Sequence, residues 1–287
     1  MGKITIIEPG LFTSVQDRGR FGYSGWGIPV SGAMDQLSLL LANSILGNNP
    51  DAACLEITQF GPTLQFSDDT VVLFSGASAP VLLNNGPVPL TNLQWLPIKK
   101  GDQLNIGYLK NGLRSYMAIK GGFQIDPLFG SRSQSLGTTH LDRLIKHDVL
   151  IYNTPSNSFS LPSGRVKPTY PWLNKKHLQV YPGPEFTSLT EIEKEALLNS
   201  HFTLSRYSNR MAIQLEERLF NKAEQILTSP VFPGTVQLTP AGKLLILMRE
   251  AQVTGGYPRI LQVKDEELDL LAQLPLGSKF KFILIES

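Results

Sequence analysis

Short apolar segments recur along the chain, each bounded by Gly, Pro, Asn or Asp. Some alternate apolar with polar residues, and this spacing of strands and turns favours an antiparallel barrel or sandwich. Lys279, Phe280, Lys281 and Phe282 alternate in this way, which predicts a strand with one face in a core and the other in water. The predicted strands cover residues 4–7, 71–74, 115–119, 178–180, 202–206, 244–248 and 280–285.

One segment near the N-terminus has helical periodicity instead. It covers residues 33–46, with Ser31 able to cap its start and Gly47 available as the residue after its end. Its buried stripe is predicted to consist of Met34, Leu37, Leu41 and Ile45.

Two further helices are predicted in the second half of the chain. One opens at Ser188, three residues before Glu191, which is the spacing of a capping box, and runs to about residue 199. The other starts after Asp265 and is stopped by Pro275. Its inward residues are expected to be Leu268, Leu271 and Ala272.

The chain of 287 residues is long enough for two lobes, because single hydrophobic cores stop growing at about 250–300 residues. Residues 153–171 are rich in Pro, Ser, Asn and Gly, so we expect an N-terminal β-rich lobe at 1–165 and a C-terminal lobe at 166–287. The predicted fold class is mainly β, with a few short helices.

Charge and composition exclude several classes of partner. The 26 basic and 24 acidic residues are interspersed, so nucleic acid is not expected. The one cysteine, Cys54, lies in an apolar run, which excludes an intrachain disulfide and predicts a buried core residue. No apolar run reaches about 18 residues, so neither a membrane span nor a location outside the cytoplasm is expected.

Common catalytic motifs are absent from the sequence. Gly242 and Lys243 are followed by Leu244, without the upstream glycine of a P-loop. The four histidines form no i, i+4 pair and no zinc-like spacing with carboxylates, so no metal site is expected. A nucleophile-elbow motif is missing as well.

A series of short motifs, in order along nearly the whole chain, is similar to one family. They include EPGLFTSVQDRGR at 8–20, GIPVSGAMD at 27–35, GSRS at 130–133, PGPE at 182–185, SNRM at 208–211, PGTVQ at 233–237 and QVTGGYP at 252–258. The chain resembles the family of the C-type subunit of 5-oxoprolinase, also known as allophanate hydrolase subunit 2 and as the kinase-inhibitor antagonist of sporulating bacteria. The family includes the carboxyltransferase region of urea carboxylase.

This resemblance implies a cyclophilin-like β-barrel architecture and a hetero-oligomer. In 5-oxoprolinase a smaller homologous partner of the B type (the allophanate hydrolase subunit 1 type) and a lactam hydrolase of the A type join the chain, and ATP drives the opening of 5-oxoproline to glutamate. In urea carboxylase the equivalent region transfers a carboxyl group from carboxybiotin to urea. The chain has no Met-Lys biotin-attachment pair, so carboxybiotin would arrive on another chain.

Three functions stay open at this point. The leading interpretation is an ATP-dependent amidohydrolase subunit that is inactive alone. The second is a biotin-dependent carboxyltransferase subunit for urea or a related amide, and the third is a non-catalytic protein that antagonises a kinase inhibitor. Two departures from the family motifs leave the substrate open: Ala212 and Gln214 replace the usual Gly and Arg, and Thr138 and Thr139 lie where a glycine pair is usual.

Gln16, Asp17 and Arg20 form a loop dense in hydrogen-bonding groups, which we expect at the mouth of a barrel. Asp17 is a candidate for proton transfer and Arg20 for stabilising anionic charge. The alternative is a solvated surface loop in which Asp17 pairs with Arg18 or Arg20.

A second group of candidates surrounds the first predicted helix. Ser31 and Asp35 lie at its N-terminus, where backbone N–H groups favour an anion, although both could simply cap the helix. Asn43 is predicted to leave the apolar stripe and to contact a ligand or solvent.

The C-terminal candidates centre on Thr254, Gly255, Gly256 and Tyr257. The two glycines let backbone approach a ligand closely, unless this is only a strand-connecting turn. Further polar candidates expected to converge on it are Gln237, Glu250, Gln252, Asn209 and Arg210, with Glu250 for proton transfer and Arg210 for anionic charge.

These candidates are predicted to share one concave site, in which Asp17 and Tyr257 lie on the same face. Replacing Arg20 or Arg210 by Ala should abolish activity, and a surface location would limit the loss of stability to about 1 kcal/mol.

Overall fold

The computed structural model describes residues 1–89, 93–154, 170–221 and 225–286. They divide into two compact units. The first contains residues 1–20 and 35–170, and the second contains residues 21–34 and 171–287. The predicted boundary between residues 165 and 166 lies outside the described residues. Sequence reasoning did not anticipate that residues 21–34, within the N-terminal half, cluster with the second unit.

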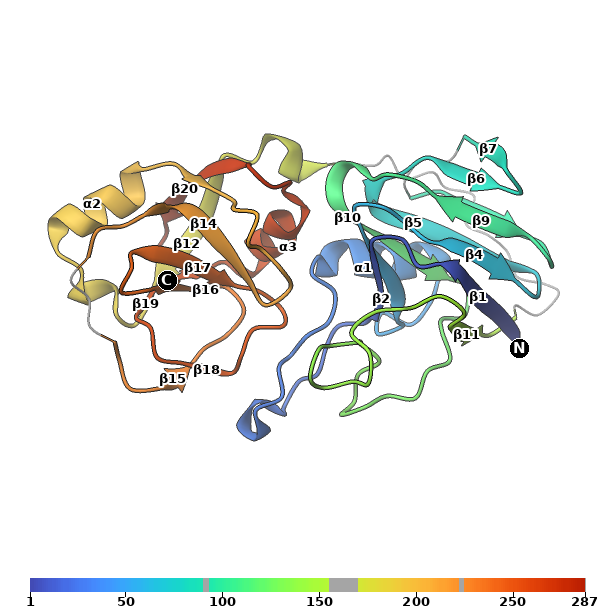
Figure 1. The fold of residues 1–287 in the computed structure, drawn as a ribbon, viewed down its shortest axis with the longest axis horizontal. Helices are drawn as coiled ribbons and strands as arrows, with labels where there is room; N and C mark the ends of the chain where they lie inside the picture. Colours follow the sequence, from blue (N-terminus) through green and yellow to red (C-terminus); the bar gives the residue numbers. More distant parts are fainter. Residues whose placement is uncertain (90–92, 155–169, 222–224, 287) are drawn as a thin grey trace. The chain divides into compact units, whose positions relative to one another are not determined.

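The first unit contains two antiparallel sheets (Figure 1). The six-stranded sheet has the order β11 (Val149–Tyr152), β1 (Gly2–Glu8), β4 (Thr63–Phe66), β9 (Gln103–Ile106), β6 (Val81–Leu83) and β7 (Gly86–Val88). The five-stranded sheet has the order β2 (Phe12–Gln16), β3 (Cys54–Thr58), β10 (Lys110–Ile119), β5 (Thr70–Ser78) and β8 (Trp95–Ile98).

One apolar core joins the two sheets of the first unit. Alternate residues of the strands supply it, for example Ile4 and Ile6 from β1 and Leu55 and Ile57 from β3. Cys54 is buried as predicted, and burial raises the pKa of its thiol to about 12.

Helix α1 (Gln36–Leu46) contacts β5 and β10 of the five-stranded sheet (Figure 1). Gly47 follows it in the left-handed conformation, as predicted, but the N-cap is Asp35 and not Ser31. The predicted stripe is wrong at two of its four positions, although Met34 is buried as expected. Leu37 and Leu41 are exposed, because the helix starts later and turns a partly polar face inward. The buried residues of α1 are Ser38, Leu39, Ala42, Asn43 and Leu46.

The second unit is built on a seven-stranded sheet and a two-stranded ribbon. The large sheet has the order β13 (Phe202–Thr203), β20 (Lys279–Leu284), β12 (His177–Pro182), β19 (Arg259–Val263), β16 (Thr235–Leu238), β17 (Lys243–Leu247) and β14 (Ala212–Arg218). The ribbon pairs β15 (Ser229–Pro230) with β18 (Thr254–Gly255). All these pairs are antiparallel except β12 with β20, which is parallel.

The large sheet curls into a nearly closed barrel. Its two ends meet, because Leu204 bridges Leu215 and the Ser205 backbone N–H donates to the Gln214 carbonyl. Phe280 and Phe282 of β20 are buried in the core, which confirms the predicted alternation. The structure therefore confirms the predicted mainly β, barrel-containing fold.

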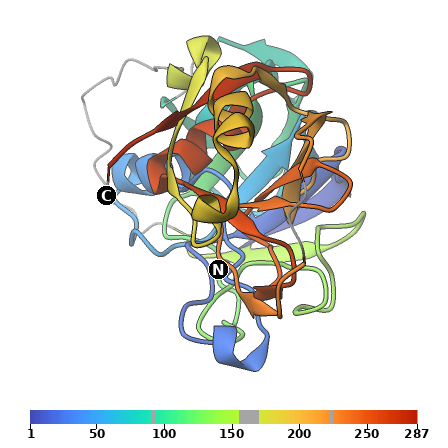
Figure 2. The ribbon, with the colours of Figure 1, turned by 90° about the vertical axis from the view of Figure 1, so that its left-hand side faces the viewer.

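The helices of the second unit lie outside this barrel (Figure 2). Helix α2 (Glu191–Asn199) packs against β20, and its capping box is formed by Thr190 and Glu193, two residues after the predicted Ser188. Helix α3 (Asp265–Gln273) starts at Asp265, one residue earlier than predicted. The three residues expected to face inward, Leu268, Leu271 and Ala272, are buried. Short 3-10 helices occupy Ser24–Trp26, Pro171–Asn174 and Phe186–Ser188.

Candidate functional site

Asp17 is the centre of a buried polar cluster in the first unit. It follows the last residue of β2, and its Oδ1 accepts hydrogen bonds from Ser131 Oγ (2.6 Å), Ser133 Oγ (2.7 Å) and the Gly19 N–H (2.9 Å). Its Oδ2 accepts one from the Arg132 N–H (2.5 Å). Only 4% of Asp17 is exposed, so it is not the solvated loop residue of the alternative prediction. These bonds hold the loop after β2 against residues 131–133.

Arg20 and Gln16 complete this cluster. Arg20 is 1% exposed and donates to the Ser133 carbonyl, so its guanidinium is enclosed by protein. Gln16 donates through Nε2 to Ser14 Oγ and to the Gln134 carbonyl, both at 2.9 Å. Its buried Oε1 accepts no hydrogen bond from the described residues and could accept one from a bound group.

A second buried network lies at the N-terminus of α1. Asp35 accepts hydrogen bonds from the Ser38 N–H (2.9 Å) and Ser38 Oγ (2.6 Å), and its own N–H donates to Tyr116 Oη (2.8 Å). Tyr116 Oη donates to Glu56 Oε2 at 2.7 Å, and Arg114 lies 3.7 Å from Glu56 Oε1. Burial, followed by the neighbouring carboxylates Glu56 and Asp35, raises the pKa of Tyr116 well above its ordinary value. The contacts of Asp35 are those of a helix cap.

Asn43 has a structural position as well. It is completely buried, donates to the Ala52 carbonyl (2.7 Å) and accepts from Asn48 Nδ2 (3.1 Å). Of the two alternatives predicted for Asn43, contact with solvent is therefore wrong. Asn48 Nδ2 also donates to the Ile119 carbonyl. The Asn43 amide therefore helps to hold Asn48, and with it the chain after α1, in place.

Arg210 and Glu250 form an ion pair in the second unit, with Arg210 Nε 2.6 Å from Glu250 Oε1. The side chains are each 9% exposed. Arg210 Nη2 also donates to the Gly32 carbonyl at 2.6 Å, and Ser31 Oγ lies 3.5 Å from Glu250 Oε1. The ion pair therefore fastens residues 31–32 to the unit to which they belong.

The backbone around Ser31 is also fixed. Its N–H donates to the Arg249 carbonyl at 2.7 Å, and the Glu250 N–H donates to the Arg210 carbonyl at 3.0 Å. Ser31 itself has a φ of 57°, a left-handed conformation that is uncommon for residues other than glycine. Such strain is found where surrounding contacts impose it, and it often accompanies functional sites.

The remaining C-terminal candidates divide into exposed and buried residues. Asn209 is exposed, and its Oδ1 accepts from the backbone N–H groups of Met211 and Ala212, so it stabilises the turn before β14. Gln252 and Thr254 are exposed. Gln237 is buried and donates to the Tyr257 carbonyl at 3.5 Å, which brings these two predicted residues together.

The glycines at 255 and 256 differ in their surroundings. Gly255 pairs with Ser229 in the β15–β18 ribbon, and a Cβ there would lie 2.5 Å from Gln237 Nε2. A Cβ at Gly256 would make only an ordinary contact, 3.5 Å from the Ile226 carbonyl oxygen, and the Gly256 carbonyl accepts from the Ile226 N–H. Close packing of Gln237 against the backbone therefore accounts for the glycine at 255.

The predicted candidates thus form separate groups. Gln16, Asp17, Arg20, Asp35 and Asn43 belong to the first unit, and all the others belong to the second. Within the second unit Ser31, Arg210 and Glu250 come together, as do Gln237 and Tyr257. A site shared between Asp17 and Tyr257 stays a prediction.

Comparison with known proteins identifies the family. A family model described as the carboxyltransferase domain, subdomain A and B, matches residues 26–284. The chain belongs to this family. The C-type subunit of 5-oxoprolinase from Escherichia coli strain K12 is 34% identical over 289 residues, which cover 98% of this chain and 90% of that protein.

Two solved structures show the same fold as this carboxyltransferase-family chain. The crystal structure of TTHA0988 has a TM-score of 0.87 and 30% identity, and the match covers 99% of this chain and 56% of that one. The Kluyveromyces lactis urea carboxylase has a TM-score of 0.86 and 28% identity, covering 99% of this chain and 27% of that one. The chain therefore spans about half, or about a quarter, of those solved chains.

Sequence reasoning missed several polar residues of this carboxyltransferase-family chain. Ser131 and Ser133 bond Asp17, and Tyr116 links Glu56 to the start of α1. The two serines stand two positions apart in the motif GSRS at 130–133, and this spacing was the signal for them. No local pattern pairs Tyr116 with Glu56, since 60 residues separate them.

Two departures from the family motifs have structural roles. Ala212 packs against Val231, Leu247 and Ala251. Thr139 Oγ1 accepts from the Ser135 N–H (2.9 Å) and lies 2.7 Å from the Leu141 carbonyl oxygen, so it stabilises its turn.

Two absences hold for the described residues. No group of three or more His, Cys, Asp or Glu side chains there could hold a metal ion. None of the described helices combines the length and apolar character needed to cross a membrane.

Proposed function

We propose that this chain is the C-type subunit of an ATP-dependent 5-oxoprolinase complex. The identity to the corresponding Escherichia coli 5-oxoprolinase subunit supports this most strongly, because it extends over 98% of this chain. In this proposal the chain works beside a smaller homologous subunit, together with a lactam-hydrolase subunit, and opens 5-oxoproline to glutamate.

The second unit offers the most suitable acid–base group for this reaction. Glu250 Oε1 is held by Arg210, while Glu250 Oε2 accepts no hydrogen bond from the described residues. A fixed carboxylate with one oxygen available can take up or release a proton during lactam opening. Arg210 keeps that carboxylate in place, so we assign it a positioning role.

The two candidate arginines, Arg20 and Arg210, do not fit a triphosphate. The guanidinium of Arg20 is 1% exposed and donates to the Ser133 carbonyl, and that of Arg210 is engaged by Glu250 and the Gly32 carbonyl. The chain also has no P-loop motif. The proposal therefore assigns ATP binding to a partner subunit.

Reconstitution tests this function. The chain, the lactam-hydrolase subunit, and the smaller subunit from the same genome would be purified and mixed, and glutamate and ADP measured with 5-oxoproline and ATP. We expect turnover with all three and background rates with this chain alone. Turnover by the isolated chain, or none by the complete mixture, would contradict the proposal.

A biotin-dependent carboxyltransferase acting on urea or a related amide is the second candidate. The TM-score of 0.86 with the Kluyveromyces lactis urea carboxylase favours it. The same preparation, supplied with carboxybiotin and urea, would then form carboxylated urea. Carboxyl transfer without any 5-oxoproline turnover would decide for this candidate.

A further inference from the structure

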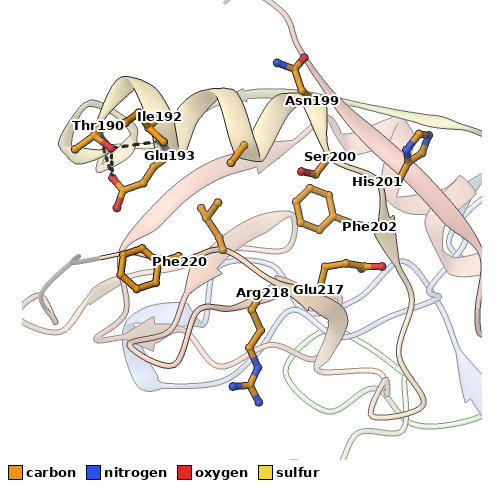
Figure 3. Close-up of a pocket in the computed structure, with 12 residues that line it drawn as sticks. Thr190, Ile192, Glu193, Asn199, Ser200, His201, Phe202, Glu217, Arg218 and Phe220 are labelled. Atoms are coloured by element: carbon orange, nitrogen blue, oxygen red, sulfur yellow. Dashed lines mark hydrogen bonds between the residues drawn. The ribbon is translucent and has the colours of Figure 1, made fainter.

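A groove of about 830 Å³ lies in the second unit between α2 and the end of β14 (Figure 3). Helix α2 and its cap form one wall, and the residues at the end of β14 form the other (Figure 3). The lining residues used below are Thr190, Ile192, Glu193, Glu217, Leu219 and Phe220. None of the site residues predicted from the sequence lines this groove.

Large apolar side chains are exposed on both walls of the groove. Ile192 on α2 is 81% exposed, and Phe220 after β14 is 83% exposed. Leu219, next to Phe220, is buried. One exposed apolar residue needs no explanation, but two on opposite walls of a groove are typical of a surface that a partner covers.

Three of the polar side chains that line the groove are bonded within the protein, and Asn199, Ser200, His201 and Arg218 also line it. Thr190 and Glu193 bond each other in the capping box of α2. Glu217 accepts from the Thr203 N–H and Thr203 Oγ1, both at 2.6 Å. A partner that covers this groove would therefore meet polar groups as well as the two exposed apolar side chains, as a helix with one apolar and one polar face does.

The two elements that form the walls of the groove carry a net negative charge. Helix α2 and strand β14 together contain five carboxylates (Glu191, Glu193, Glu195, Glu216 and Glu217) against the two cations Lys194 and Arg218, whereas the whole chain has a net charge of +2. Burial alone would raise the pKa of Glu217, but the hydrogen bonds from Thr203 outweigh burial and hold that pKa below its ordinary value. Glu217 is therefore ionised at neutral pH.

We propose that this groove docks an amphipathic helix of the smaller subunit, with apolar residues on one face and Lys or Arg beside them. Helices dock in grooves through apolar anchors, and the acidic walls select a basic partner. This inference rests on the proposed assembly with that subunit. Ile192 and Phe220 would contact the apolar face of the incoming helix.

The test measures the Kd between this chain and the purified smaller subunit from the same genome. Ile192→Ser and Phe220→Ser each remove one apolar anchor and should weaken binding at least tenfold. The matched controls, Ile283→Ser and Phe232→Ser, replace exposed residues of the same types in the same unit, outside the groove lining, and should change Kd less than twofold. Increasing salt should weaken the wild-type complex, because the walls are charged. Circular dichroism would confirm that each variant is folded.

Each outcome separates this inference from the proposed function. If the wild-type chain forms no complex, the proposed assembly and the docking groove are both wrong. If the complex forms with unchanged Kd in Ile192→Ser and Phe220→Ser, the groove is wrong and the assembly stands. If sedimentation shows self-association that both groove variants abolish, the occupant is a second copy of this chain, which overturns the proposal.

Discussion

The guanidinium of Arg210 joins a carboxylate and a backbone carbonyl that are far apart in the sequence. Its Nε lies 2.6 Å from Glu250 Oε1, and its Nη2 lies 2.6 Å from the Gly32 carbonyl oxygen. Both charged side chains are about nine-tenths buried. The pair is thus a structural connection as well as a candidate part of the active site.

We expect Arg210→Ala to destabilise the protein by about 3 kcal/mol, because it leaves the Glu250 carboxylate buried without its cation. This exceeds the loss of about 1 kcal/mol predicted for a surface arginine. Chemical denaturation of Arg210→Ala, Glu250→Gln and the double variant measures it. The double variant should lose less than the sum of the single losses, and additive losses would show that the two side chains are not coupled.

Asp17→Asn tests the buried cluster of the first unit. Asparagine retains the Oδ1 acceptor but puts an N–H₂ group where Oδ2 accepts from the Arg132 N–H. The variant should therefore lose about 2 kcal/mol of unfolding free energy, since two donors then face each other. Thermal denaturation of Asp17→Asn and of Ser133→Ala compares the two positions. Unchanged stability together with lost turnover in the complex would instead indicate a chemical role for Asp17.

The cap of α2 can be tested with a matched pair of substitutions. Thr190→Ala removes the side chain that accepts from the Glu193 N–H and should cost about 1 kcal/mol. Ser188→Ala removes only a hydrogen bond from Ser188 Oγ to the Glu185 carbonyl and should cost less. Urea denaturation of both variants measures the difference. A larger loss for Ser188→Ala would place the cap where the sequence first suggested.

The Glu185–Arg259 pair predicts a dependence of stability on pH. Hydrogen bonds from the Arg259 side chain hold the pKa of Glu185 below its ordinary value of 4.5, with Arg259 Nη2 2.7 Å from Glu185 Oε1. Because the folded-state pKa is lowered, its stabilisation is fully present above pH 4.5 and is lost as pH falls through the folded-state value.

Glu185→Gln should therefore be less stable than the wild type by about 2 kcal/mol at neutral pH. The difference should shrink as pH falls below 4.5. Denaturation curves at a series of pH values measure it. A difference that does not vary with pH would mean that the ionised form of Glu185 is not preferentially stabilised.

Local pattern was sufficient for much of the fold. The alternation at 279–282 predicted β20, because successive side chains of a strand point to opposite faces. The third helix followed from its apolar spacing and from Pro275. The order of short motifs along the chain indicated the family that the comparison then showed.

The start of α1 required the tertiary structure. Ser31 and Asp35 are both acceptable N-caps by residue type. Ser31 instead adopts a φ of 57° and donates its N–H to the Arg249 carbonyl, so Asp35 caps the helix. The sequence alone contains no signal for that contact, since more than 200 residues separate its partners.

The sequence by itself determined the strands, the approximate helices, the family and the polar residues worth testing. Only the tertiary structure decided that Asp17 and Arg20 are buried and that Arg210 pairs with Glu250. Periodicity and capping depend on neighbours within a few residues, whereas burial and ion pairing depend on which distant segments pack together.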